Sequence, residues 1–438
     1  MTTQTPAPTR TAFGYSARAN NAVDQPISYL MMLALTRPEL ISLAAGFVDY
    51  DTLPGNQTDE MLHKILSDPA ASRAALQYGR TQGLTELRQL AYNHLAKWDG
   101  IDPADYPGNP DCVALTTGSQ QMLHILADLL VDPGDIVITA WPSYFVYTGA
   151  LSVFGATVRS VDLDEDGIIP EKLDALLERI RAEGNLHRVK MLYTCTHHQN
   201  PTGITLSAER RPQLLDIVKK YSTHHRILLL EDNAYRELTY SGEAPVSIKS
   251  FDNDNEYVAL LHTFSKPFAP GLKTGYGLLP ADLCDKAMML KDGRDFGSAN
   301  LSQHLLLRAL QNGAFDKQVE TLCDAYTKKR DAMLGALKEH LGDFMPGETH
   351  WTHPTGGLYV WLTLPKSIDT SRHGPLFKRA VELGMLYVPG DYCYPADPTR
   401  TVPKNQIRLS FGVPTVEQNR EGVRLLAQAI KDVAREDV

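Results

Sequence analysis

The chain has 438 residues, of which 43% are hydrophobic and 22% are charged, and this composition is typical of a globular protein with two or three structural units. The formal net charge of -9 argues against a nucleic-acid-binding protein that works through a broadly basic surface. The five cysteines are widely spaced and form no CxxC pair, so they indicate neither a disulfide framework nor a structural zinc site.

The first 26 residues are polar and rich in Pro, Thr and Asn, which is typical of a mobile arm or of a segment that is ordered only against another surface. They contain no apolar core of signal-peptide length, and no later apolar run reaches the length of a membrane span. Together with the unpaired thiols, these features lead us to expect a cytoplasmic protein.

Helical and strand-like segments alternate from about residue 56. Residues 58–68 and 85–100 have the apolar spacing of amphipathic helices. Short segments that are rich in Leu and β-branched residues predict strands at 135–140, 190–195, 226–232 and 257–264. Because strands alternate with helices, we expect an α/β fold with a mostly parallel sheet that is covered by helices on both faces.

The C-terminal third has fewer predicted strands. Residues 304–341 predict a long helix, a break and a longer helix, which could connect two domains. Strand-like segments follow at 356–365, 384–391 and 406–412, with a helix around 374–384 and a final amphipathic helix at 415–436. We therefore expect an N-terminal arm that also supplies part of a small domain (1–55), a large domain (56–318) and a small α+β domain (319–438).

Gly118, Ser119 and Gln120 directly precede an apolar run with helical spacing, so they are predicted to lie at a helix N-terminus. Free backbone N–H groups and the helix dipole favour an anion there, and the Ser and Gln side chains add donors. An ordinary helix cap is the alternative interpretation.

Several polar and aromatic residues lie at or just beyond the ends of predicted strands: Trp141, Tyr144, Asn200, Asp232 and Tyr235. Ligands of open α/β sheets bind at the carboxyl ends of the strands, so these side chains are candidates for one site. An aromatic residue there either stacks on a flat heterocycle or covers the core. A carboxylate at the end of an apolar strand needs a cationic partner, for which a metal and a protonated heterocyclic nitrogen are both candidates.

His197 and His198 are adjacent and suggest a metal site at first sight. No further His or Cys lies at a ligand spacing from them, so we interpret both as loop residues and predict no metal.

Lys266 and Lys273 lie in "HTFSKPFAPGLKTGYG", a stretch without any carboxylate. Two exposed lysines are the alternative interpretation. A phosphorylated cofactor explains both: Lys273 would meet a phosphate at the Ser119 helix end, and Lys266 would form a Schiff base with an aldehyde. Pyridoxal 5'-phosphate (PLP) requires such a lysine, a carboxylate for its ring nitrogen, a donor for its phenolic oxygen and an anion site.

The motifs "LQYGRTQGLTELR", "TTGSQQ", "WPSY", "HQNPTG", "EDNAY", "TFSKPFAPGLKTGYG", "PTGGLYVWLTLP" and "IRLSFG" occur in this order between about residues 40 and 414. In this series the chain resembles the class I/II aminotransferases of the fold type I PLP enzymes. The resemblance is strongest to the branch that contains kynurenine and 2-aminoadipate aminotransferases. It implies a large PLP-binding domain with a mostly parallel sheet and a smaller α+β domain.

The resemblance also implies roles for individual residues. Lys266 would bind the PLP aldehyde and act as general base, Asp232 would pair with the ring nitrogen, and Tyr144 would stack on the ring. Asn200 and Tyr235 would donate to the phenolic oxygen. The phosphate would be held by Ser119, Gln120, Thr263, Ser265 and Lys273, and by Tyr78 of a neighbouring subunit in a homodimer. Arg408 would bind the substrate α-carboxylate next to Gly46 and Asn200. The family usually has arginine where this chain has Lys273.

The implied activity is transfer of an amino group from an α-amino acid to a 2-oxo acid with ping-pong kinetics. A β-lyase, a γ-elimination enzyme and an oxidase are alternatives on the same scaffold, because they share the cofactor residues. A PLP-binding regulator would need a DNA-binding module, for which residues 1–40 are too short and too uncharged. The expected partners are small molecules. Tyr29, Phe47, Tyr144 and Tyr359 would admit an aromatic or long aliphatic substrate.

Overall fold

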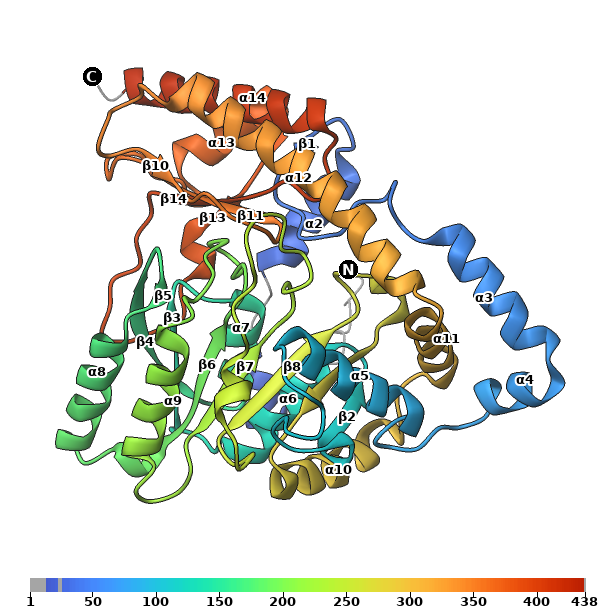
Figure 1. Ribbon diagram of the computed structural model, residues 1–438. Helices are drawn as coiled ribbons and strands as arrows, with labels where there is room; N and C mark the ends of the chain where they lie inside the picture. The colour runs from blue at the N-terminus through green and yellow to red at the C-terminus, as the bar shows by residue number, and fades with distance from the viewer. Residues whose placement is uncertain (1–12, 23–25, 437–438) are drawn as a thin grey trace, which may run out of the picture.

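The computed structural model describes residues 13–22 and 26–436. Its larger sheet has eight strands in the order β2–β9–β8–β7–β6–β3–β4–β5 (Figure 1). Strands β8, β7, β6, β3 and β4 run parallel to one another, whereas β9, β2 and β5 are antiparallel to their neighbours. The strands are β2 (Val113–Thr116), β3 (Ile136–Trp141), β4 (Thr157–Asp164), β5 (Gly167–Ile168), β6 (Val189–Cys195), β7 (Leu228–Asp232), β8 (Val258–Thr263) and β9 (Gly275–Leu278). This arrangement confirms the mostly parallel sheet that the sequence predicted.

Helices cover both faces of this sheet because its central strands are apolar on both sides. Leu230, Ala259 and Leu261 face one layer of helices, while Leu229 and Leu260 face the other. Burial of a leucine side chain contributes about 1.5–3 kcal/mol, so each layer stabilises the sheet. The first layer comprises α6 (Ser119–Leu130), α7 (Phe145–Val153) and α10 (Ala281–Asp295); the second comprises α5 (Thr85–Trp98), α8 (Pro170–Ala182), α9 (Arg210–Tyr221) and α11 (Asn300–Gln311).

A second, four-stranded sheet is antiparallel and has the order β10–β11–β14–β13. It shares a hydrophobic core with three helices that lie above it in Figure 1. The strands are β10 (His350–Trp351), β11 (Tyr359–Thr363), β13 (Val388–Pro389) and β14 (Gln406–Ser410), and the helices are α12 (Ala314–Leu341), α13 (Pro375–Leu383) and α14 (Val416–Glu436).

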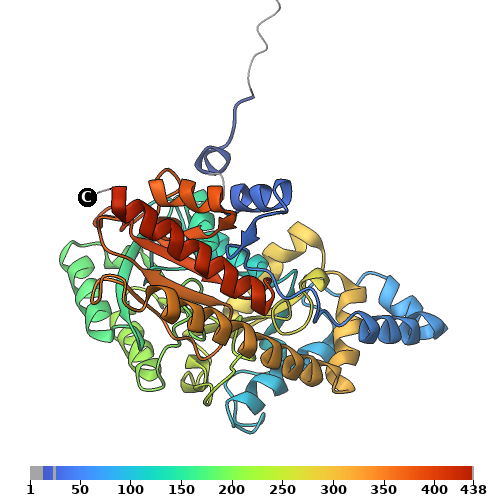
Figure 2. The ribbon, with the colours of Figure 1, turned by 90° about the horizontal axis from the view of Figure 1, so that it is seen from above.

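The N-terminal part of the chain joins this second unit. Strand β1 (Ile41–Ser42) pairs in parallel with β12 (Met385–Leu386), so residues far apart in sequence lie side by side. Helix α2 (Pro26–Thr36) precedes β1, and Figure 2 shows α3 (Gly55–Ser67) and α4 (Pro69–Leu76) projecting to one side.

Most of the predicted arm, residues 1–12 and 23–25, lies outside the described residues. The described part of the arm contains α1 (Ala17–Asn21), which contacts α7 on the large sheet. The Arg18 guanidinium pairs with Asp128 of α6 at 2.7 Å and lies 5.3 Å from the centre of the Phe154 ring. This short segment is therefore tied to the first helical layer.

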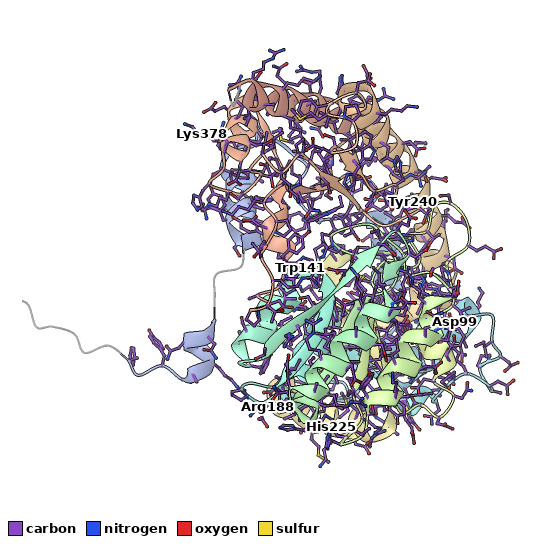
Figure 3. All side chains as sticks on the ribbon, turned by 90° about the vertical axis from the view of Figure 1, so that its left-hand side faces the viewer. Asp99, Trp141, Arg188, His225, Tyr240 and Lys378 are labelled. Atoms are coloured by element: carbon purple, nitrogen blue, oxygen red, sulfur yellow. The ribbon has the colours of Figure 1, made fainter. Side chains whose placement is uncertain are left out.

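The parallel strands all point their carboxyl ends at the junction between the two units. Figure 3 shows Arg188 and His225, which precede β6 and β7, at the far end of the large unit, whereas Trp141, the last residue of β3, lies at the junction. Tyr240 also lies there, and its backbone N–H donates to the Thr355 carbonyl at 2.8 Å. The edge at which ligands of such sheets bind therefore faces the second unit.

In the part of the chain that the structure describes, no helix is both long and apolar enough to cross a membrane. The five cysteines are all free thiols. Over the same described residues, no group of three or more His, Cys, Asp and Glu side chains is placed to hold a metal ion.

Candidate active site

A cavity of about 360 Å³ lies at the carboxyl edge of the large sheet and reaches the second unit. This volume is in the range of small-molecule sites. Twelve of the thirteen residues predicted from the sequence line it; the exception is Tyr78. The twelve are Gly46, Ser119, Gln120, Tyr144, Asn200, Asp232, Tyr235, Thr263, Ser265, Lys266, Lys273 and Arg408.

The N-terminus of α6 forms one end of the cavity. Ser119 and Gln120 are its first two residues, and Gly118 precedes them with a φ of 71° and no side-chain cap. No acidic residue lies in the first turn. Free N–H groups and the positive end of the helix dipole are therefore available to an anion, which favours the anion-site interpretation over an ordinary cap.

The loop after β8 forms the other side of this anion site. The Thr263 hydroxyl donates to Ser265 Oγ at 3.0 Å and accepts from the Ser265 backbone N–H at 3.2 Å. Lys273 has a left-handed backbone with a φ of 48° and is exposed at the rim. A Cβ on Gly275 would lie 2.6 Å from the Ser119 nitrogen, so only glycine lets β9 pass this close to the helix end.

Asp232 is the acidic group of the cavity and is only 5% exposed. The Tyr193 hydroxyl donates to its Oδ2 at 2.9 Å, while its Oδ1 is buried without a hydrogen-bond partner. Burial raises the pKa of Asp232 to about 6, against a smaller lowering by Tyr193 and His262. A buried carboxylate oxygen without a donor is costly, so a ligand that brings a proton-bearing cation fits this position.

Lys266 lies at the floor of the cavity, where its Nζ donates to the Gly46 carbonyl at 2.8 Å. Burial lowers the pKa of the Lys266 amine; Tyr359 partly opposes this effect, and the positive charges of Arg408 and Lys273 add to it. A larger share of the amine is then neutral, which is the form that acts as nucleophile and base.

Two tyrosines of the same cavity lining, Tyr144 and Tyr235, supply hydroxyl groups. Burial raises the pKa of Tyr235 and of Tyr144, so both hydroxyls keep their protons and can donate. The hydroxyls of Tyr235 and Tyr359 lie 3.3 Å apart. Asn200 Oδ1 accepts from Arg408, which leaves the Asn200 NH2 group free to donate to a ligand.

Arg408 of β14 brings a positive charge into the cavity from the second unit and is 2% exposed. Its Nη1 donates to Asn200 Oδ1 at 3.0 Å and its Nη2 to the Ala44 carbonyl at 2.7 Å, both neutral oxygens. The guanidinium lies 4.5 Å from the centre of the Tyr359 ring. Its Nε has no hydrogen-bond acceptor, so this buried cation can still donate to an anionic ligand.

Other candidates from the sequence lie elsewhere. Trp141 is 8% exposed and packs against Arg400 and Tyr394, which is the core-covering alternative. Tyr29 lies beneath Arg372, outside the cavity lining.

The two loop histidines are buried and have hydrogen-bond partners. The ring nitrogens of His198 lie 2.9 Å from Thr239 Oγ1 and 3.0 Å from Thr205 Oγ1. Nε2 of His197 lies 2.9 Å from the Pro245 carbonyl. These contacts give the loop a packing role.

Sequence reasoning missed Tyr193 and Cys195, which also line the cavity. Both lie on β6, and Cys195 pairs with Asp232 across the parallel ladder. Strand alternation places Tyr193 and Cys195 on the same face, so the pairing of β6 with β7 is the signal that could have found them.

Comparisons with known proteins show the family of this chain. The family model for class I and II aminotransferases matches residues 38–426. Aromatic-amino-acid aminotransferase 1 of Thermococcus litoralis is 35% identical over 418 residues, which cover 95% of this chain and 94% of that protein. The 2-aminoadipate transaminase of Thermus thermophilus is 33% identical over 404 residues, which cover 91% and 92%. The solved kynurenine aminotransferase of Pyrococcus horikoshii, in complex with PMP, has a TM-score of 0.85 at 32% identity and covers 96% of this chain and 97% of that one.

The chain therefore belongs to the class I and II aminotransferases. It is a PLP-dependent aminotransferase of fold type I that acts on amino acids, as the sequence predicted. The cavity fits this cofactor, because it combines the partnerless Asp232 oxygen, the Lys266 amine and an acid-free helix end.

Proposed function

We propose that the predicted residues hold PLP in this cavity. The phosphate binds at the N-terminus of α6 and the facing loop, through Ser119, Gln120, Thr263, Ser265 and Lys273. The acid-free first turn of α6 supports this assignment.

Tyr144, which lines the cavity, would stack on the cofactor ring. Asp232 Oδ1 would accept a hydrogen bond from the protonated ring nitrogen, and the Asn200 amide and the Tyr235 hydroxyl would donate to the phenolic oxygen. The observation that supports this orientation is the buried Oδ1 of Asp232, which has no hydrogen-bond partner while Oδ2 accepts from Tyr193.

The amino acid would bind in the same cavity through its α-carboxylate. The Arg408 fork binds that carboxylate, and the Gly46 backbone and the Asn200 amide border it. Bound PLP draws electrons from the bond that breaks at the α-carbon. Lys266 removes the α-proton as general base, because its lowered pKa leaves a neutral amine. Release of the oxo acid before the second oxo acid binds predicts ping-pong kinetics.

The substrate class is an aromatic or large apolar amino acid. Aromatic side chains line the cavity: Phe47, Tyr144, Phe145, Tyr235 and Tyr359. Its described lining has three cations, and all have assigned partners: Arg408 for the α-carboxylate, Lys266 for the cofactor aldehyde and Lys273 for the phosphate. No cation of this lining remains for a side-chain carboxylate. The similarity to an aromatic-amino-acid aminotransferase and a kynurenine aminotransferase supports the same class.

Stopped-flow absorbance of the PLP-loaded protein tests this proposal without a second substrate. The enzyme is mixed with phenylalanine, kynurenine or 2-aminoadipate, and the second-order rate constant of cofactor conversion is measured. This constant should be at least about tenfold higher for the two aromatic compounds, because the side-chain carboxylate of 2-aminoadipate would be buried without a cation at a cost of more than about 1.4 kcal/mol. An equal or higher rate with 2-aminoadipate would contradict the proposed class.

The enzyme acts as a homodimer in which Tyr78 completes the phosphate site of the neighbouring subunit. Tyr78 is 82% exposed, and its ring lies 5.9 Å, centre to centre, from that of Phe296, itself 60% exposed, in an edge-on arrangement. Leu76 nearby is 64% exposed. Large apolar side chains gathered on one surface are typical of a protein interface.

Hybrid dimers test the sharing of the site. Tyr78→Ala and Lys266→Ala proteins are each expected to be weakly active. Co-refolded, they form a hybrid in which one site has both residues intact, so activity should return to about a quarter of wild type. Absence of recovery, with dimers confirmed by light scattering, would show that each subunit uses its own Tyr78.

Two further points rest on the sequence and on free thiols. The chain divides into the large PLP-binding domain (56–318) and a small domain made from 319–438 with part of 1–55. Its location is the cytoplasm, where the five free cysteines would stay reduced.

A further inference from the structure

The carboxylate that faces the cofactor ring has one fixed oxygen and one free oxygen. Tyr193 Oη lies 2.9 Å from Asp232 Oδ2, and both side chains are buried, at 1% and 5% exposed. Oδ1, the other oxygen, has no partner. A carboxylate held at one oxygen can rotate little, so the Tyr193 hydroxyl decides where Oδ1 points.

Tyr193 is itself held in place by its strand and by a neighbouring ring. It lies on β6, next to Leu230 across the ladder, and Asp232 lies two residues further along β7. The ring of Tyr147, on α7, packs against it with ring centres 4.6 Å apart. The donor is therefore fixed before any ligand binds.

We infer that Tyr193 is a positioning residue that keeps Asp232 ionised and aims its Oδ1 at the ring nitrogen of the cofactor. This inference rests on the proposed role of Asp232.

Few side chains are placed to affect the charge state of Asp232. The side chains that face Asp232 are Tyr193 and Cys195 from β6, Tyr144 and Tyr147 from the start of α7, and His262 from β8. Burial raises the pKa of Tyr193, so its hydroxyl keeps the proton that it donates. Burial raises the pKa of Asp232 and so favours the neutral acid; the hydrogen bond from Tyr193 and the electrostatic effect of His262 oppose this.

A neutral Asp232 cannot hold a protonated ring nitrogen. Removal of the Tyr193 hydroxyl should therefore move the proton from the ring nitrogen toward the carboxylate, by about one pKa unit, or a tenfold change in the ratio of the two forms. The rate of proton removal at the α-carbon should fall with the protonated share of the ring, while the KM for the amino acid, which Arg408 sets, should stay unchanged.

The test uses PLP labelled with ¹⁵N in its ring, bound to the full-length protein, with the ¹⁵N resonance as a readout of ring protonation. Tyr193→Phe should move this resonance toward that of the unprotonated ring and lower kcat about tenfold at constant KM. Tyr147→Phe is the matched control. It also removes a buried tyrosine hydroxyl from the adjacent ring, but this hydroxyl has no hydrogen-bond partner. It should leave both readouts at wild-type values. Tyr193→Leu removes the same donor and serves if the Phe variant does not fold.

Asp232→Asn separates this inference from the site assignment. If the resonance shifts in Asp232→Asn but stays at the wild-type position in both Tyr193 variants, the inference is wrong and the site stands. If Asp232→Asn leaves the resonance unchanged, the assignment of Asp232 itself fails. An equal shift in Tyr193→Phe and Tyr147→Phe would also overturn the inference, since it would show a general effect of lost hydroxyls.

Discussion

Replacement of Arg408 by methionine should remove activity without removing stability. Arg408 is 2% exposed, and both of its hydrogen-bond acceptors, Asn200 Oδ1 and the Ala44 carbonyl, are neutral. A buried cation without a carboxylate loses hydration that its surroundings restore only in part. Methionine has a similar reach, so Arg408→Met should unfold at the same urea concentration as wild type or a higher one.

The loss of activity follows from the bound state. Truncation of one partner in a buried, hydrogen-bonded charge pair costs about 2–5 kcal/mol. For the substrate α-carboxylate, a cost of about 3 kcal/mol corresponds to a decrease of roughly 10²-fold in kcat/KM. The affinity for PLP should stay within about twofold, because the proposed cofactor contacts do not include Arg408.

A second buried arginine provides the contrast. Arg211 is fully buried, and its Nη1 lies 3.7 Å from Oε1 of the equally buried Glu231. Arg211→Met leaves that carboxylate without its cation, so it should destabilise the protein by about 3–5 kcal/mol. Urea unfolding and steady-state kinetics on both variants give the assay. If Arg408→Met were as unstable as Arg211→Met, or kept its kcat/KM, the proposed role of Arg408 as an unpaired receptor for a carboxylate would be refuted.

Three other substitutions test separate parts of the site. Lys266→Ala should lower turnover by at least the roughly 10²–10⁴ of a positioned acid or base, and full activity would exclude its role. Burial raises the pKa of Asp232 from 3.8 to about 6 in the folded apoprotein, so ionised Asp232 lowers the free energy of unfolding increasingly as the pH rises from about 4 to 6. The free energy of unfolding of Asp232→Asn apoprotein should therefore be about 3 kcal/mol higher than that of wild type at pH 7 and equal to it near pH 4. A difference that does not change with pH would contradict this. Gly275→Ala would place its Cβ 2.6 Å from the Ser119 nitrogen and 2.7 Å from the His262 carbonyl, so the helix end that is proposed to bind the phosphate must shift. The binding free energy of PLP should weaken by about 1–3 kcal/mol. Gly293→Ala, which has open space around its Cβ, should leave the PLP affinity unchanged.

The sequence predicted the parts of the fold and site that local patterns determine. Asp232 follows an apolar strand, Ser119 starts a helix, and the Lys266 loop follows another strand, so strand-end reasoning alone places them at one edge. Their spatial grouping in one cavity could therefore be anticipated.

Contacts that depend on strand register or on packing between units were beyond that reasoning. The bond between Tyr193 and Asp232 follows from the pairing of β6 with β7, which sequence spacing does not define. Likewise, Arg408 meets Asn200 only because β14 packs against the loop after β6. The role proposed for Tyr78 requires a second subunit, and a single chain shows only that its side chain is exposed.

Covalent capture of the cofactor tests the central claim most directly. The protein is loaded with PLP, reduced with borohydride, digested and mapped by mass spectrometry. We expect a single phosphopyridoxyl group on the peptide that contains Lys266, and its loss in Lys266→Ala. A phosphopyridoxyl group on Lys273 or another lysine, with Lys266 unmodified, would contradict it.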